Sequence, residues 1–527
     1  MARDGHHGSR NSQGDDIEEE TPLLGQQHNG LHDRLHDELD RERVQLRLRV
    51  TLLCFLITFL LELGFGISVP PTNELMEGIL CRQMHPESTR NSTLPWGQGT
   101  PDDPCKNPDV QSYLAMLRGW SYTFEAIPGL LCAVPYGILS DRWGRKPVML
   151  LGILGLTLAV GFNMVVFLLS DIVPLWFTWF GALFYFIGGT AQMVIAMLYT
   201  FIADVTPVSE RATVFFQMGA AFLVSSVLAG VLGGVIMAKS DWAALGVSLA
   251  LLILGLLVGF AFPETVHLHG PAMQKTTGRL ADGRNTSTDE EDDHGKRSPF
   301  QNLRLKAKDS FGDVGEFVIG NKRLSFLMLS IIFVILGKCV TELLMQYATK
   351  RYRWTWSKAT LLLTVRSVAS VVTLLALLPL AGRFCVTRLG MSAMSKDLWL
   401  ARLSGVFGVL GCLVIAVASN GNLLCVGLVW LSLGSGVSQL TRSLLNSLVE
   451  EHHVGIVNAL LSIMEQVGVM LAGPLLAKSL SLGMNLGGPW IGLPFIVAAL
   501  FLAISTAIVF VFRLPTRTTL PSAETEQ

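Results

Sequence analysis

Twelve long apolar segments constrain this chain more than any other feature of its sequence. A helix needs about 20 predominantly apolar residues to cross the hydrocarbon core of a bilayer. Segments of this kind lie at 50–70, 119–139, 148–170, 175–203, 213–237, 242–262, 324–345, 358–381, 402–419, 423–446, 456–480 and 490–513. Only 15% of the residues are charged, whereas soluble proteins carry about 25%. The sequence therefore predicts an all-α, polytopic membrane protein with twelve transmembrane helices.

The distribution of Arg and Lys predicts that both chain termini lie in the cytoplasm. Four arginines (Arg41, Arg43, Arg47 and Arg49) precede the first apolar segment, and basic residues favour the cytoplasmic side. An even number of spans returns the chain to that side. We therefore expect a disordered cytoplasmic tail at 1–49, a six-helix half at 50–262, a cytoplasmic loop at 263–323, a second six-helix half at 324–513 and a cytoplasmic tail at 514–527.

The first exterior loop, expected at 71–118, holds two further signals. Asn91 begins an Asn-Ser-Thr triplet, which is an N-glycosylation acceptor on the exterior side. Cys81 and Cys105 lie in the same loop. An oxidising exterior allows these two cysteines to form a disulfide, and two free thiols are the alternative.

Two cytoplasmic segments carry patterns of their own. Glu19, Leu23 and Leu24 fit the acidic dileucine sorting pattern, and a chance match in a polar tail is the alternative. In the central loop, apolar residues from 303 to 318 recur at helical spacing beside basic residues. This pattern favours a short helix in the membrane interface over a plain linker.

A short polar hairpin separates the second and third apolar segments. Residues 136–147 read Y-G-I-L-S-D-R-W-G-R-K-P. Gly137 and Gly144 permit a tight reversal with close backbone approach. The stretch resembles the loop 2–3 signature of the major facilitator superfamily, G-x-L-S-D-R-x-G-R-K-P, at every fixed position. This resemblance implies two six-helix halves related by an axis along the membrane normal, which transport a solute by alternating access.

The resemblance also implies a gating role for the hairpin. Asp141 would face the start of span eleven near 455–457, where a carboxylate at a helix N-terminus is stabilised. Arg142, Arg145 and Lys146 would contact cytoplasmic acids, and the candidates are Asp204, Glu210, Glu450 and Glu451. The alternative is that the basic residues only set topology.

Two departures limit the resemblance to drug/proton antiporters of this superfamily. Span four lacks the Arg that many of them carry, and 229–234 keeps the glycines of their span-five signature without its proline. Pro263, Glu264 and Thr265 resemble the short P-E-[ST] element that members often carry after span six.

Six of the charged residues inside predicted spans are candidates for function, because a charge costs about 2.5–3.5 kcal/mol at the helix centre. They are Glu62, Glu125, Lys338, Glu342, Arg366 and Glu465. We interpret them as candidates for proton coupling or for the substrate cavity, with Glu62 as the foremost proton carrier. Structural alternatives remain: Glu62 in a hydrogen bond to a neighbouring helix, Lys338 paired with Glu342 four residues away, and Arg366 neutralising a carboxylate rather than holding an anionic substrate group. Arg442 is interpreted as a charge at the membrane boundary.

The chain as a whole resembles fungal members of the superfamily that export small organic metabolites, and more distantly folate-type symporters. We therefore predict a proton-coupled efflux pump for a secondary metabolite or toxic compound. The alternatives are a proton-coupled uptake symporter and a non-transporting nutrient sensor on the same scaffold. The sequence shows no enzyme motif, and we expect no cofactor, no metal and no nucleic-acid partner. We expect a monomer in the lipid bilayer of the cell membrane, or of the vacuolar membrane if the dileucine pattern acts.

Overall fold

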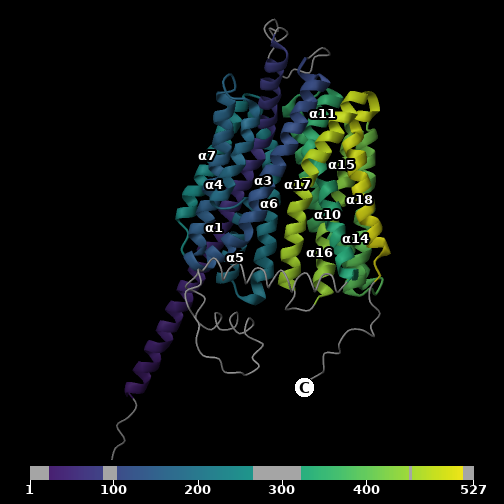
Figure 1. Ribbon diagram of the computed structural model, residues 1–527. Coiled ribbons are helices and arrows are strands. Elements are labelled where there is room, and N and C mark those ends of the chain that lie inside the picture. The colour runs from purple at the N-terminus through teal and green to yellow at the C-terminus, as the bar shows by residue number, and fades with distance from the viewer. Residues whose placement is uncertain (1–22, 87–103, 265–321, 450–453, 514–527) are drawn as a thin grey trace, which may run out of the picture. The chain divides into compact units, whose positions relative to one another are not determined.

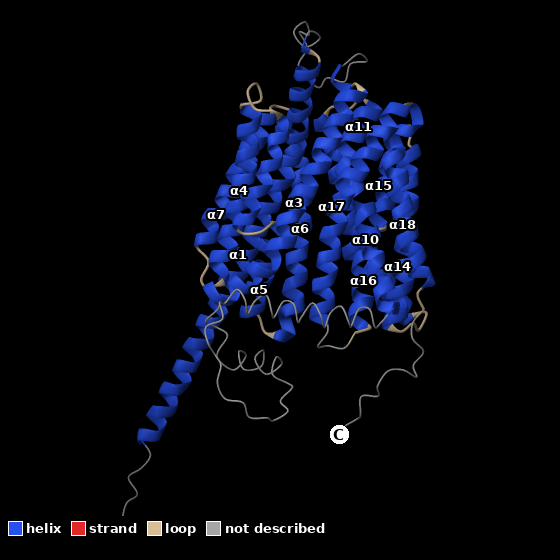
Figure 2. Cartoon of the chain, viewed as in Figure 1, coloured by secondary structure: helices blue, strands red, loops and turns tan. Residues whose placement is uncertain are grey.

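A computed structural model describes residues 23–86, 104–264, 322–449 and 454–513. Within these ranges the chain is helical, with short turns and no strand (Figure 2). Eleven helices are long and apolar enough to cross a membrane, and the 36-residue helix α3 (Pro108–Trp143) is a twelfth long helix. The all-α membrane architecture predicted from the sequence is thereby confirmed.

The described residues up to Arg49 belong to a unit separate from the one that begins at Val50. Helix α1 (Leu23–Met84) begins inside this first unit, so 23–49 are helical rather than disordered as we expected. The physical reason is composition, because this segment is rich in Leu and Arg, which both favour helix.

The first half of the second unit contains the remainder of α1 and seven further described elements. In chain order these are η1 (Pro104–Lys106), α3 (Pro108–Trp143), α4 (Arg145–Leu168), η2 (Leu175–Ile187), α5 (Ala191–Val205), α6 (Val208–Met237) and α7 (Asp241–Phe260). Helix α4 packs against η2, α5 and α7, and α6 packs against α5 and α7. η2 and α5 together form the fourth span.

The second half has the same number of spans, several of them interrupted. Its elements are α10 (Lys322–Lys338), η4 (Cys339–Leu343), α11 (Leu344–Tyr352), α12 (Trp356–Val372), η5 (Thr373–Leu377), α13 (Leu378–Thr387), α14 (Ala393–Val417), α15 (Gly421–Leu433), α16 (Gly436–Ser447), α17 (Val454–Leu486), η7 (Gly488–Gly492) and α18 (Leu493–Val511). Helix α14 packs against α15, α16 and α18, and α10 packs against α17 and α18.

The exterior loop expected at 71–118 is shorter than predicted, because α1 continues to Met84 and α3 begins at Pro108. We expected the first span to end at Pro70, and a proline inside a helix removes a backbone donor. The helix nevertheless continues through Pro70 and Pro71. Beyond them Met76, Ile79 and Leu80 are at most 4% exposed, and burial of these side chains stabilises the continued helix.

Cys81 and Cys105, expected to pair, are joined by a disulfide, with Cα atoms 5.0 Å apart. The bond ties the last turn of α1 to η1. We call the end of the second unit that carries Met84, η1 and Tyr352 the exterior end, following the orientation predicted from the basic residues. This bond therefore fixes the start of α3 to the end of α1 at the exterior end.

The two halves meet where α3 lies along α17 and α6 lies along α12, and α3 and α17 are side by side in Figure 1. Gly119 of α3 faces Gly473 of α17, and a Cβ atom on Gly119 would stand 2.6 Å from the Gly473 carbonyl oxygen. Gly230 of α6 packs in the same manner against Thr364 of α12. Small residues thus permit close backbone approach in both of these helix pairs.

Several sequence predictions lie outside the described residues. These are Glu19, Asn91, the interfacial helix at 303–318 and the acidic pair Glu450 and Glu451. Leu23 and Leu24 begin α1. All of them stay predictions.

Candidate functional site

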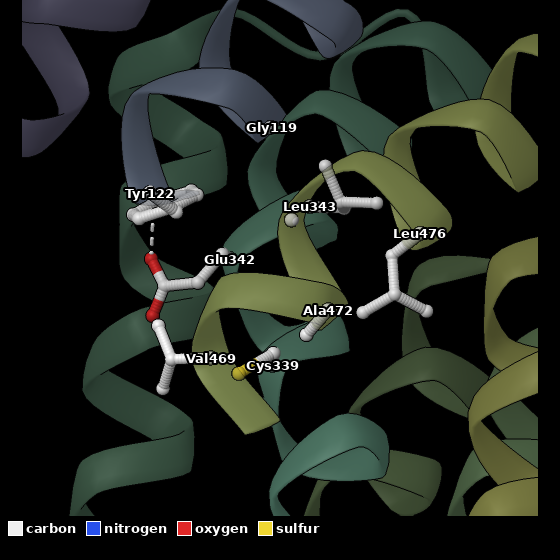
Figure 3. A pocket seen from close by; sticks show the side chains of 9 residues that line it. Gly119, Tyr122, Cys339, Glu342, Leu343, Val469, Ala472 and Leu476 are labelled. Carbon is white, nitrogen blue, oxygen red and sulfur yellow. Dashed lines mark hydrogen bonds between the residues drawn. The ribbon is translucent and has the colours of Figure 1, made fainter. Parts of the chain in front are cut away.

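A cavity of about 140 Å³ lies between the halves, next to the glycine contact (Figure 3). It is lined by Gly119, Tyr122, Cys339, Glu342, Leu343, Val469, Ala472, Gly473 and Leu476. Most of this lining is apolar. The hydroxyl of Tyr122 donates a hydrogen bond of 2.9 Å to the Glu342 carboxylate, drawn as the dashed line in Figure 3. The cavity therefore has apolar walls and one polar corner, which is typical of small-molecule sites.

Arg118 extends this polar corner by one helical turn. Its guanidinium donates a hydrogen bond of 3.0 Å to the Tyr122 hydroxyl and lies within the electrostatic influence of Glu125 and Glu342. Two of the carboxylates that the sequence analysis singled out, Glu125 and Glu342, thus lie near the guanidinium of Arg118. We missed Arg118 because our predicted span began one residue after it. Tyr122 carries no formal charge, so a search for charged residues in spans could not find it.

Among the described residues Lys338 and Glu342 form no ion pair with each other. The alternative that these two side chains pair along one helix face is therefore wrong. The Lys338 ammonium donates instead to the Ser435 carbonyl oxygen at 3.1 Å and to the Ser438 hydroxyl at 3.0 Å. The reason lies in the backbone. Helix α10 ends at Lys338 and η4 follows, and the tighter 3₁₀ turn removes the α-helical spacing that would place the two side chains on one face.

Glu465 of α17 forms an ion pair with Arg442 of α16, at 3.0 Å. Arg442 is therefore not the simple boundary charge that we predicted. Arg366 and Glu465 both act electrostatically on Lys338, so these four residues form one charged group in the second half. The sequence could not reveal it, because its members come from α10, α12, α16 and α17.

Glu62 lies apart from both groups, in the first half. It lines a small cavity of about 30 Å³ together with Thr58, Leu61, Phe65, Leu156, Ala191, Ile195, Leu198 and Phe222. Most of these neighbours are apolar. Among the described residues Glu62 makes no ion pair, so its carboxylate is not held in the charged form by a fixed partner.

The hairpin of 136–147 forms the junction of α3 and α4, at Gly144, whose φ is +105°. The Glu264 carboxylate accepts hydrogen bonds from the backbone N–H groups of Arg145 at 3.1 Å and Lys146 at 3.3 Å. A carboxylate at this position satisfies helix-terminal donors and opposes the positive end of the helix dipole. We had noticed Glu264 only as part of the P-E-[ST] resemblance, and its role as the cap of α4 became visible only in three dimensions.

The basic side chains of the hairpin contact the chain around them. Arg145 forms an ion pair with Asp204, one of the predicted acidic partners, and donates to the Thr200 carbonyl oxygen at 3.1 Å. Lys146 donates to the Phe260 carbonyl oxygen at 2.8 Å. These contacts tie α4 to α5 and α7. The side chains of Asp141 and Arg142 are not described, so their gating roles stay predictions.

No group of three or more His, Cys, Asp or Glu suited to a metal ion occurs in the described ranges. The arrangement instead offers an apolar cavity between two halves, a carboxylate without a described ion pair at Glu62, and close glycine contacts. These are features that allow a small molecule to bind between two bodies that move relative to each other.

Known proteins resemble the chain over most of its length. The MFS efflux pump atnC of Emericella nidulans is 30% identical over 461 residues, which cover 86% of each chain. The MFS-type transporter avaK of Aspergillus versicolor is 28% identical over 436 residues, 82% of this chain and 86% of that one. A D-xylose-proton symporter of known structure superposes with a TM-score of 0.56 at 16% identity, over 86% of this chain and 97% of that one.

The family model described as Major Facilitator Superfamily matches residues 111–473. This range runs from the first turn of α3 to Gly473 in α17, and so includes the hairpin, both charged groups and the cavity lining except Leu476. The predicted family is confirmed, and the chain is a multi-pass membrane transporter of the major facilitator superfamily.

Proposed function

We propose that this chain is a proton-coupled efflux pump that exports a small organic compound. The observation that carries this proposal is the similarity, over 86% of both chains, to a protein named an MFS efflux pump. A second relative of 28% identity, from Aspergillus flavus, is also named an efflux pump. The fold alone does not fix the direction of transport, so the proposed direction rests on these two relatives.

We assign proton binding to Glu62. A carboxylate within a span is costly, and Glu62 occupies an apolar pocket in the first half. Since it makes no ion pair among the described residues, proton uptake and release at Glu62 break no salt bridge. Two of the other candidate carboxylates are held by fixed partners, because Glu465 forms an ion pair with Arg442 and Glu342 accepts a hydrogen bond from Tyr122.

The substrate would bind against the cavity between the halves. Its walls come from α3, η4 and α17, so a bound compound contacts both halves and senses their relative position. The apolar walls favour a compound with substantial apolar surface. We propose the cell membrane as the location, since export of a toxic compound requires it.

The test begins by identifying the compound. Cells lacking the gene are compared with cells that overproduce the chain, by mass spectrometry of intracellular and external metabolites. A compound that accumulates inside the deletion cells supports export, whereas a compound that becomes depleted inside them would establish uptake and overturn the proposed direction.

The coupling is then measured with the purified full chain in liposomes. An imposed pH gradient should drive movement of that compound, and Glu62→Gln should abolish gradient-driven transport while leaving compound exchange intact. Asp171→Asn, at an exposed position outside the spans, serves as the matched control. If the gradient has no effect on transport by the unmodified chain, the proposal of proton coupling is wrong. If the Glu62→Gln variant keeps full gradient-driven transport, another carboxylate carries the proton.

A further inference from the structure

Glu77 is a buried carboxylate near the exterior end, outside the cavity and outside every motif found in the sequence. It lies in the part of α1 beyond Pro71, and the residue is only 3% exposed. Its two oxygens accept hydrogen bonds from the Lys106 ammonium at 2.6 and 2.8 Å. They also accept from the side-chain amide of Gln111 and from the indole N–H of Trp356.

Three side chains of the second half close onto this site. Trp356, at the start of α12, is 1% exposed and donates to Glu77. Gln346 of α11 donates to the backbone carbonyl of Gln111 at 2.7 Å and to its side-chain oxygen at 3.1 Å. Lys350 of α11 donates to the carbonyl of Lys106. All three residues of the first half therefore have a direct partner across the boundary.

The two sets of bonds differ in what happens when the halves separate. The ion pair of Glu77 with Lys106 lies entirely within the first half. Breaking a buried pair would leave an uncompensated charge, but separation of the halves leaves this pair intact. The hydrogen bonds from Trp356, Gln346 and Lys350 and the contact of Lys106 with the Trp356 ring are lost, and water can replace these hydrogen bonds in the opened state. The contact is therefore specific and also reversible.

The disulfide places Lys106 for this role. Cys105 precedes Lys106 directly, and its partner Cys81 lies one helical turn after Glu77 on α1. Lys106 also lies over the Trp356 ring, 5.4 Å from the centroid, a favourable position for a cation. The covalent bond thus holds the cation beside both its anion and its aromatic partner.

We propose that Glu77, Lys106, Gln111, Gln346, Lys350 and Trp356 form an exterior latch that holds the two halves together at the exterior end while the central cavity is closed to the outside. Glu77 is the positioning residue of the latch, because it aligns its partners without lining the cavity. The latch operates in either direction of transport. It can therefore be correct even if the proposed efflux function or proton coupling fails.

Cys339 offers a native reporter for the test, because it lines the cavity beside Glu342. The full-length chain is treated in sealed membranes with a membrane-impermeant maleimide, from the exterior in one set and from the cytoplasmic face in inverted vesicles. Peptide mass spectrometry measures the labelling rate at Cys339, and Cys339→Ser defines the background. No substrate or pH gradient is needed.

Trp356→Phe removes the indole donor and keeps an aromatic ring. We expect exterior labelling to rise about tenfold, which corresponds to the loss of one hydrogen bond to a charged group, and cytoplasmic labelling to fall. Trp354→Phe is the matched control, since Trp354 packs within the second half beside Tyr352 and Lys358, and we expect no change. Gln346→Met, which removes the bonds to Gln111, should act as Trp356→Phe does and replaces it if that variant fails to fold.

Unchanged exterior labelling in the folded variants would overturn the latch. A rise in the labelling rate from both faces would also overturn the latch. That result indicates general loosening of the protein rather than a shift from the conformation closed to the outside to the one closed to the cytoplasm. A rise at the exterior alone, with the reciprocal fall inside, supports it.

Discussion

Tyr122 in α3 and Glu342 in η4 are joined by a hydrogen bond of 2.9 Å that crosses from one half of the transporter to the other. The same hydroxyl accepts a hydrogen bond from Arg118. Both residues line the cavity between the halves. The bond therefore links one cavity-lining residue of each half directly to the other.

Tyr122→Phe should fold normally and slow transport about tenfold, because it removes one hydrogen bond to a charged group. The transport rate is measured in liposomes with the compound identified from metabolite comparison. Tyr113→Phe on the same helix is the control, since Tyr113 is 47% exposed. Equal rates in both variants would show that the bond between the halves does not contribute to the cycle.

Asp204→Asn should lower the free energy of unfolding by about 3 kcal/mol, the usual cost of breaking a buried ion pair from one side. The Asp204 side chain is 2% exposed and that of Arg145 is 13% exposed, so water can compensate little of the loss. Denaturant titration in mixed micelles measures the change. The exposed substitution Asp171→Asn should leave the unfolding free energy unaltered, and a similar loss in both would assign the effect to charge alone.

Gly144→Ala and Gly137→Ala should behave differently although both positions belong to the hairpin signature. Gly144 has a φ of +105°, and an added Cβ would stand 2.5 Å from the Glu264 carboxylate, so we expect a destabilisation of about 1–3 kcal/mol. Around Gly137 no atom lies within 4 Å of an added Cβ. There alanine should be neutral or slightly stabilising, because it favours helix. Thermal unfolding of the two variants checks this, and equal behaviour would contradict the geometry at Gly144.

Gly473→Ala should slow transport by disfavouring the arrangement in which α3 and α17 are in contact. The added methyl group would collide with the backbone of Gly119, and overpacking of this kind costs about 1–3 kcal/mol. The measurement is the rate of compound exchange. Gly246→Ala in α7, where an added Cβ meets open space, is the control; an unslowed Gly473→Ala variant would mean that this contact is not formed during the rate-limiting part of the cycle.

The sequence predicted the family and the twelve spans because both depend on local information, namely apolar length and one short motif. It failed where three-dimensional packing decides. Pro70 and Pro71 did not end α1, and this error concealed Glu77 in an expected loop. The ion pair of Arg442 with Glu465 joins two helices, and no spacing rule along one helix could predict it. Lys338 and Glu342 have helical spacing in the sequence, yet the change to η4 directs them to different partners.

The contact of Gly119 with Gly473 also bears on how fast the halves can move. Helices that interlock ridges with grooves must unmesh before one rolls over the other. Here two glycine backbones meet beside the small side chain of Ala477, so no large side chains interlock at Gly119 and Gly473. We expect this contact to slide with a low kinetic barrier, while affinity and specificity are left to the side chains around it.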